Sequence, residues 1–255
     1  GYDASRILNT TFLNKMCEEY LAQKKDEANE NVSIEKVFNG KTLSTIGDSI
    51  SYHDRRQLLE KGVFTIGYQS ILKERLGFKN VLNRSISGAP IAEGTKNGKG
   101  LSLAFREDDF SDTDFLIIAG GTNDFRLDVP IGTKDEIINP DKNMNTFYGA
   151  YSSLVERAIK SNPNMKIQLW TPFKRDNSGY DTYSVNNSQH TLSDYRQAII
   201  DIAEHFDITF CDMYNESGVE ESNLDELTVD GLHLNNKGYE VVSKTAEDCL
   251  NRIEK

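Results

Sequence analysis

The chain has 255 residues, of which 37% are hydrophobic and 27% are charged, as expected for a globular protein with one substantial core. Its formal net charge of −11 argues against a nucleic-acid backbone or an anionic membrane as the main partner. No apolar run approaches the roughly 18 residues of a membrane span, and no signal-peptide pattern opens the sequence. The cellular location stays open, and an extracellular or cell-surface location is compatible with these features.

The amino-terminal residues 5–25 form one amphipathic helical pattern, and the polar residues 26–33 follow as a linker. The apolar face of this helix consists of Leu8, Phe12, Met16 and Tyr20. We therefore divide the chain into an arm with its linker, residues 1–38, and one domain, residues 39–255. The arm either packs on the domain, which we favour, or mediates assembly into a homo-oligomer.

Alternating strand and helix patterns fill the remainder of the chain. The apolar run 114–119 is uninterrupted, which is typical of a strand covered on both faces of a parallel sheet. The alternation predicts a three-layer α/β/α sandwich with a parallel sheet of about five strands. In chain order the expected elements are a strand over 41–46, a helix over 64–76, strands beginning at 81 and over 114–119, a helix over 146–160, a strand over 166–170, a long polar loop over 171–189, a helix over 192–205, a strand over 208–213 and a final helix over 236–253.

Three cysteines, Cys17, Cys211 and Cys249, are widely spaced along the chain. Their number and spacing fit neither a disulfide scaffold nor a zinc site, so we expect buried free thiols.

Residues suited to acyl transfer follow several predicted strands, at the edge where open α/β sheets bind ligands. They are Ser49, Gly88, Asn123, and the pair Asp230 and His233. Serine needs an adjacent base to act as a nucleophile, histidine suits that task, and a carboxylate can fix its tautomer. A backbone N–H beside a glycine and an asparagine amide can hold an oxyanion. Alone, each segment is more typical of a turn or a cap; together they form a complete set.

Other histidines compete for the role of base. His190 lies in the long polar loop and is the serious rival, whereas His205 lies late in a helix, where it suits the helix dipole. His53 is too near Ser49 in sequence to face it easily across a strand end.

The chain resembles the SGNH or GDSL-type esterases and lipases over residues 41–253. The segments that carry the resemblance, in the family's order, are Gly47-Asp48-Ser49, residues 83–88, Gly121-Thr122-Asn123-Asp124 and Asp230-Gly231-Leu232-His233. The resemblance implies a flavodoxin-like sandwich and a serine esterase without metal or other cofactor. The chain departs from the family pattern because it lacks a glycine soon after the serine and has two long insertions, 129–146 and 171–189.

By this resemblance Ser49 is the nucleophile, His233 the general base and Asp230 the residue that orients it. The implied oxyanion hole comprises the backbone N–H groups of Ser49 and Gly88 with the Asn123 side chain.

Rival classes fit the sequence less well. No Gly-x-Ser-x-Gly pentapeptide or phosphate-binding glycine loop occurs, and four scattered histidines do not readily make a two-metal site. A non-catalytic carbohydrate-binding or structural module on this fold remains the alternative from a different class.

The substrate is expected to be a small or glycan ester. The candidate substrate-binding residues are Asp48, Trp170, Tyr180 and Tyr183, because aromatic rings interspersed with amides stack on and hydrogen-bond a sugar ring. We therefore expect a carbohydrate O-deacetylase, with a short-chain lipase, lysophospholipase or thioesterase as alternatives.

Overall fold

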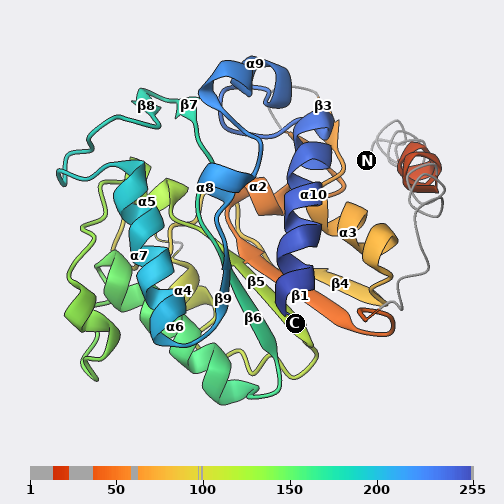
Figure 1. Cartoon of the computed structure of the whole chain (residues 1–255). Coiled ribbons are helices and arrows are strands. Elements are labelled where there is room, and N and C mark those ends of the chain that lie inside the picture. Colours follow the sequence, from red (N-terminus) through yellow and green to blue (C-terminus); the bar gives the residue numbers. More distant parts are fainter. Residues whose placement is uncertain (1–13, 23–36, 59–62, 97, 99, 254–255) are drawn as a thin grey trace, which may run out of the picture.

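A computed structural model describes residues 14–22, 37–58, 63–96, 98 and 100–253 (Figure 1). Among these residues no helix combines the length and the apolar character needed to cross a bilayer.

A sheet of five parallel strands forms the centre of the domain, in the order β4-β1-β5-β6-β9. The strands are β1 (Thr42–Gly47), β4 (Asn80–Asn83), β5 (Phe115–Ala119), β6 (Lys166–Trp170) and β9 (Thr209–Cys211). All six residues of β1 are buried, and its last residue, Gly47, is in register with Ala119 of β5. Because the strands are parallel, their carboxyl ends meet at one edge, as the sequence predicts.

Helices cover both faces of this sheet, which gives the predicted three layers (Figure 1). Side chains of β5 alternate between two cores: Leu116 and Ile118 face one, Phe115 and Ile117 the other. The first core is covered by α4 (Leu101–Ala104), α6 (Phe147–Ser161) and α7 (Leu192–His205). The second is covered by α3 (Tyr68–Leu76) and α10 (Asn236–Ile253).

Short elements follow the strand ends and build the rim. They are α2 (Ser49–Tyr52), α5 (Thr122–Arg126), α8 (Met213–Glu216), α9 (Leu224–Leu227), the 3-10 turns η1 (Lys134–Ile137) and η2 (Glu221–Asn223), and two antiparallel hairpins, β2 (Arg56–Leu58) with β3 (Val63–Thr65) and β7 (Asp176–Asn177) with β8 (Tyr180–Asp181). The sequence pattern places Phe64 in a helix, but the structure places it in β3, opposite Gln57. Two- and three-residue strands carry too little periodicity to be predicted from the sequence.

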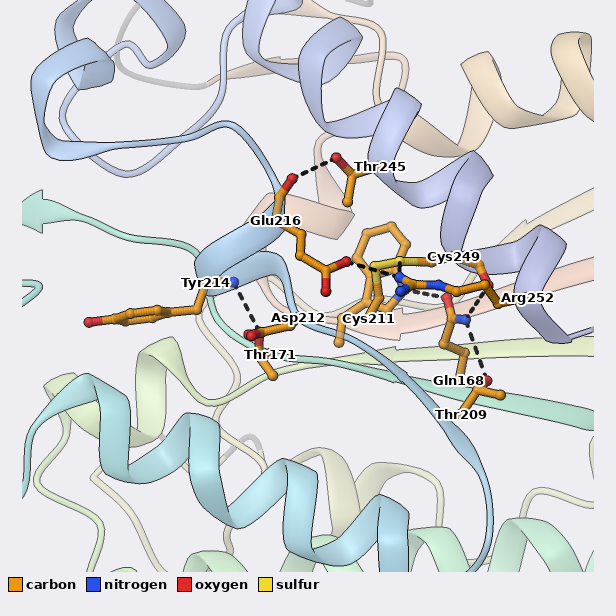
Figure 2. The surroundings of a disulfide bond; sticks show 11 residues. Gln168, Thr171, Thr209, Cys211, Asp212, Tyr214, Glu216, Thr245, Cys249 and Arg252 are labelled. Carbon is orange, nitrogen blue, oxygen red and sulfur yellow. Dashed lines mark hydrogen bonds and ion pairs between the residues drawn. A yellow bond between two sulfur atoms is a disulfide. The ribbon is translucent and has the colours of Figure 1, made fainter.

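The expectation of three free thiols is wrong for two of the cysteines, because Cys211 and Cys249 form a disulfide (Figure 2). Cys211 ends β9 at the edge of the sheet, and α10 passes over that edge with Cys249 in its last turns. Spacing in the sequence says nothing about this proximity, which follows from the sheet order. Gln168 on β6 donates to the Cys249 carbonyl at 2.9 Å, so side chain and disulfide together hold α10 to the sheet. Cys17 is free and buried.

Residues 14–22 of the predicted arm are helical, and this helix packs on the domain. Leu21 is buried, the Tyr20 hydroxyl donates to Glu240 on α10 at 2.6 Å, and Glu18 pairs with Arg55 at 2.8 Å. Residues 1–13 and 23–36 of the arm lie outside the described residues, and its part in assembly stays a prediction.

Candidate active site

Ser49 lies two residues after the end of β1, at the carboxyl edge of the sheet. Asp48 caps α2 by accepting the Ile50 N–H at 2.9 Å, and Ser49 is the first helical residue. A Cβ on Gly47 would lie 2.9 Å from the Ala119 carbonyl oxygen and 2.6 Å from the Ser51 hydroxyl. Glycine is therefore required at this position for close approach of the neighbouring strand rather than for an unusual backbone angle.

Ser49, His233 and Asp230 form one hydrogen-bonded row. The Ser49 hydroxyl lies 2.9 Å from Nε2 of His233, and Nδ1 of the same ring lies 2.9 Å from Oδ2 of Asp230. The other Asp230 oxygen accepts the backbone N–H of His233 at 2.9 Å. With the carboxylate ionised, Nδ1 carries the ring proton and Nε2 is left to accept the proton of the serine.

The pKa values of two carboxyl groups at this site are shifted in opposite directions: that of Asp230, a member of the row, is lowered, and that of Asp48 is raised. Burial alone would raise the pKa of Asp230, but the hydrogen bonds from the His233 ring and backbone outweigh it and lower that pKa to about 2. Burial raises the pKa of Asp48 to about 6, opposed by the Ile50 N–H and by His233. Asp230 therefore stays ionised at neutral pH, as the partner of an imidazolium must.

Gly88 lies in a turn that follows β4 along the extension of β1. The Ile86 N–H donates to the Gly47 carbonyl at 2.9 Å, and the Ala89 N–H donates back to Ile86 at 3.1 Å. Gly88 occupies the third position of this turn with φ of 76°, a left-handed conformation that favours glycine. The first residue of this turn, Ile86, is thus hydrogen-bonded to Gly47, two residues before Ser49.

Asn123, on α5, approaches the same turn. Its amide nitrogen donates to the Ala89 carbonyl at 3.2 Å, which places the amide against the peptide between Ala89 and Pro90. The next residue, Asp124, accepts the backbone N–H groups of Ile91 and Ala92 at 2.9 to 3.0 Å. Burial raises the pKa of Asp124 to about 7, and these two donors oppose the rise. Sequence reasoning missed this anchor, although Asp124 stands within the matched segment.

His190 and His53 are not part of this row and have other neighbours. His190 is tied by its backbone N–H to Asn186 at 3.0 Å, and its ring packs edge-on against Tyr195. His53 is near this row through His233 rather than through Ser49. Its ring centroid lies 6.1 Å from that of His233, edge to face. Burial and the neighbouring His233 lower the pKa of His53, and its Nδ1 is buried without a hydrogen-bond partner among the described residues.

The four residues expected to contact substrate fall in different places. Trp170 is fully buried, stacked near Tyr68, with its indole N–H donating to Gln168 at 2.9 Å. This expectation is therefore corrected: alternation along β6 turns the ring into the core. Asp48 is also buried, as the cap of α2.

Tyr180 is half-buried against Phe125, and Tyr183 is 69% exposed. Tyr183 lines a cavity of about 530 Å³ next to Asp230, whose other walls include Asp181 and Glu221. Within the described ranges, no three histidine, cysteine or carboxylate side chains gather in a way that could hold a metal ion.

Comparisons with known proteins agree with this fold. The sequence model of the GDSL-like lipase/acylhydrolase family matches residues 45–241. Among solved structures, a protein from Lactobacillus plantarum is 24% identical, with a TM-score of 0.69 over 84% of this chain and 98% of that one. A protein named a possible lipase from Chitinophaga pinensis is 21% identical, with a TM-score of 0.68 over 84% and 99% of the two chains. A GDSL-like lipase from Bacteroides thetaiotaomicron is 18% identical, with a TM-score of 0.56 over 91% and 97%. No curated protein matches.

Proposed function

We propose that this chain, which belongs to the GDSL-like lipase/acylhydrolase family, hydrolyses short acyl esters through attack by Ser49. The observation that carries the proposal is the hydrogen-bonded row in which Ser49 Oγ and His233 Nε2 lie 2.9 Å apart, with Asp230 at the same distance from Nδ1. Nucleophile, base and orienting group within hydrogen-bond reach are the geometric signature of this chemistry.

The reaction proceeds in two transfers. Ser49 Oγ attacks the carbonyl carbon while Nε2 of His233 takes the hydroxyl proton, and His233 then gives that proton to the departing alcohol oxygen. Water attacks the acyl-serine with the same base, which releases the carboxylic acid and restores the serine. Asp230 stabilises the imidazolium in both steps without taking its proton.

The oxyanion of each tetrahedral intermediate is held by three donors: the backbone N–H groups of Ser49 and Gly88 and the side-chain amide of Asn123. Ser49 is the first residue of α2, so its N–H has no carbonyl partner within that helix. The contact of the Asn123 amide with the Ala89 carbonyl supports its place beside Gly88. Preorganised donors of this kind commonly supply the largest share of catalysis in acyl transfer.

For the substrate, we propose O-acetyl groups on carbohydrate. The cavity beside Asp230 carries the carboxylates of Asp176, Asp181, Glu221 and Asp225 and the exposed ring of Tyr183. Carboxylates accept hydrogen bonds from sugar hydroxyls, and an exposed ring offers a stacking face. Trp170 has no part in this proposal, because it is buried.

The test compares acyl chain lengths and acceptors. We expect faster turnover of acetyl than of octanoyl aryl esters and release of acetate from an acetylated polysaccharide. Faster octanoate cleavage without acetate release would favour a short-chain lipase, lysophospholipase or thioesterase, and no hydrolysis of any ester would favour a non-catalytic module.

A further inference from the structure

Arg175 is an arginine buried completely between the two halves of the proposed site. It follows β6, at the start of the long segment that the sequence analysis reads as a loop. Burial lowers its pKa to about 10, and the carboxylates of Asp48 and Asp230 act against that fall. The side chain is therefore a cation at neutral pH, held in the interior of the domain.

The guanidinium group donates hydrogen bonds to two separate pieces of chain, Thr122 of α5 and the β7–β8 hairpin. Nη1 donates to the carbonyl and the hydroxyl of Thr122, at 3.2 and 2.7 Å. Nη2 donates to the Asn177 carbonyl at 3.0 Å, and Nε donates to the Tyr180 carbonyl at 3.1 Å. Within the described residues all its acceptors are carbonyl or hydroxyl oxygens, so this cation acts as a connector rather than as a member of an ion pair.

Both ends of this connection belong to the proposed site. Thr122 immediately precedes Asn123 in α5. On the other side, the Asn177 side chain donates to the Asp230 carbonyl at 2.8 Å, and the Asp176 N–H donates to the Gly231 carbonyl at 2.8 Å. The hairpin β7–β8, which lies at the rim near α5 in Figure 1, is thus hydrogen-bonded to the loop that carries His233.

We propose that Arg175 is a positioning residue for ester hydrolysis: through Thr122 on one side and Asn177 on the other, it fixes the distance between the Asn123 amide and the Asp230–His233 loop. The proposal rests on the function proposed above. The oxyanion donor and the general base act on opposite sides of one carbonyl group, so a change in their separation lowers turnover even when each residue is intact. The planar guanidinium group reaches four acceptor oxygens on three residues in fixed directions, which an ammonium group cannot do.

Arg175→Lys keeps the positive charge and removes the planar guanidinium group. We expect kcat for an acetyl ester to fall roughly 10- to 100-fold with KM within about twofold, while the circular dichroism spectrum is unchanged. Arg157→Lys is the matched control, because Arg157 is half-buried and donates to the Ser102 carbonyl, a contact that joins α6 to α4. It should leave kcat unchanged.

A second variant keeps the proposal testable if Arg175→Lys folds poorly. Asn177→Ala removes the side-chain bond to Asp230 but keeps the carbonyl that Arg175 contacts, and it should lower kcat several-fold. The double variant should lose less kcat than the product of the two single losses, because both substitutions break the same connection between Thr122 and the Asp230 loop. If the fold-losses in kcat of the two single variants multiply in the double variant, the positioning role is overturned. A wild-type kcat in Arg175→Lys would also overturn it.

Ser49→Ala is measured in parallel to separate the two proposals. An inactive Ser49→Ala with a fully active Arg175→Lys contradicts the role of Arg175 alone. Full activity in Ser49→Ala contradicts the proposed function, and the inference about Arg175 falls with it.

Discussion

The imidazole Nε2 of His233 lies 2.9 Å from the hydroxyl of Ser49, although 184 residues separate the two in the chain. The sheet order accounts for the meeting: β1 lies between β4 and β5 and ends at Gly47, two residues before Ser49, while the loop before α10 passes over the same edge. Tyr239 on α10 donates to the Ile50 carbonyl at 2.6 Å and ties that helix to the serine turn. The predictions below test what this geometry does.

Loss of the base should be more damaging than loss of the residue that orients it. His233→Ala should lower kcat by roughly six orders of magnitude and Asp230→Asn by roughly four, because proton transfer is lost in the first and only misoriented in the second. Steady-state kinetics on an acetyl aryl ester measures both. His205→Ala is the control and should be fully active; a comparable loss in His190→Ala would show that the base is misassigned.

The amide of Asn123 should contribute to turnover and little to substrate binding. Asn123→Ala should lower kcat roughly 100- to 1000-fold with KM nearly unchanged, since an oxyanion forms only along the reaction path. Asn162→Ala is the matched control, because its amide donates to the carbonyls of Phe110 and Thr113, away from the site. That control should lose stability and keep its kcat; an unchanged kcat in Asn123→Ala would remove this donor from the mechanism.

The close packing of the β7–β8 hairpin on the Asp230 loop can be tested with two glycines. Gly231 and Gly179 have nearly the same backbone angle, φ of 79° and 77°, so alanine is strained by about 1 kcal/mol at either position. A Cβ on Gly231 would lie 1.9 Å from the Asp176 carbonyl oxygen, whereas Gly179 has nothing within 4 Å.

Gly231→Ala should therefore lower kcat about tenfold or more, because the clash displaces the loop, while Gly179→Ala should lose only stability. Thermal unfolding and kcat are measured for both. Equal kcat in the two variants would mean that the hairpin contact does not influence catalysis.

Stability should depend on pH through Asp124. In the unfolded chain this carboxyl group loses its proton near pH 4, whereas in the folded protein its pKa is about 7. The folded state thus binds more protons between these values, so the contribution of Asp124 to stability falls as pH rises from about 4 to about 7. Asp124→Asn cannot ionise and can still accept both backbone N–H groups through its amide oxygen.

The unfolding midpoint of Asp124→Asn relative to wild type should accordingly rise between pH 5 and pH 8. For Asp230, whose pKa is lowered to about 2, the sign is reversed: its contribution is present above pH 4 and is lost in stronger acid. A midpoint difference for Asp124→Asn that stays flat from pH 5 to pH 8 would contradict the assignment of a raised pKa.

Long periodic elements could be predicted from the sequence. The helices over 192–205 and 236–253 have the predicted bounds, because each carries a full apolar stripe, and Thr191 caps the first. The continuous apolar run at 115–119 gave β5 for the same reason, since a strand buried on both faces has no polar side.

Other features depend on tertiary neighbours. Alternation along β6 turns Trp170 to one face of the sheet, and its burial there also depends on the helices that cover that face, including α3 with Tyr68. The pairing of Cys211 with Cys249 depends on which strand forms the edge under α10. Arg175 follows another cation, Lys174, in a polar stretch, and its burial depends on a hairpin of two-residue strands that no periodicity marks.

The central claim is that the Ser49 hydroxyl is the nucleophile, and an organophosphonate that reacts with activated serines tests it most directly. After labelling, peptide mapping by mass spectrometry locates the phosphonyl group. We predict one label per chain, on Ser49, with loss of esterase activity in proportion to labelling, and no label on a folded, inactive Ser49→Ala. A label on another residue, or full hydrolysis by Ser49→Ala, would contradict the account.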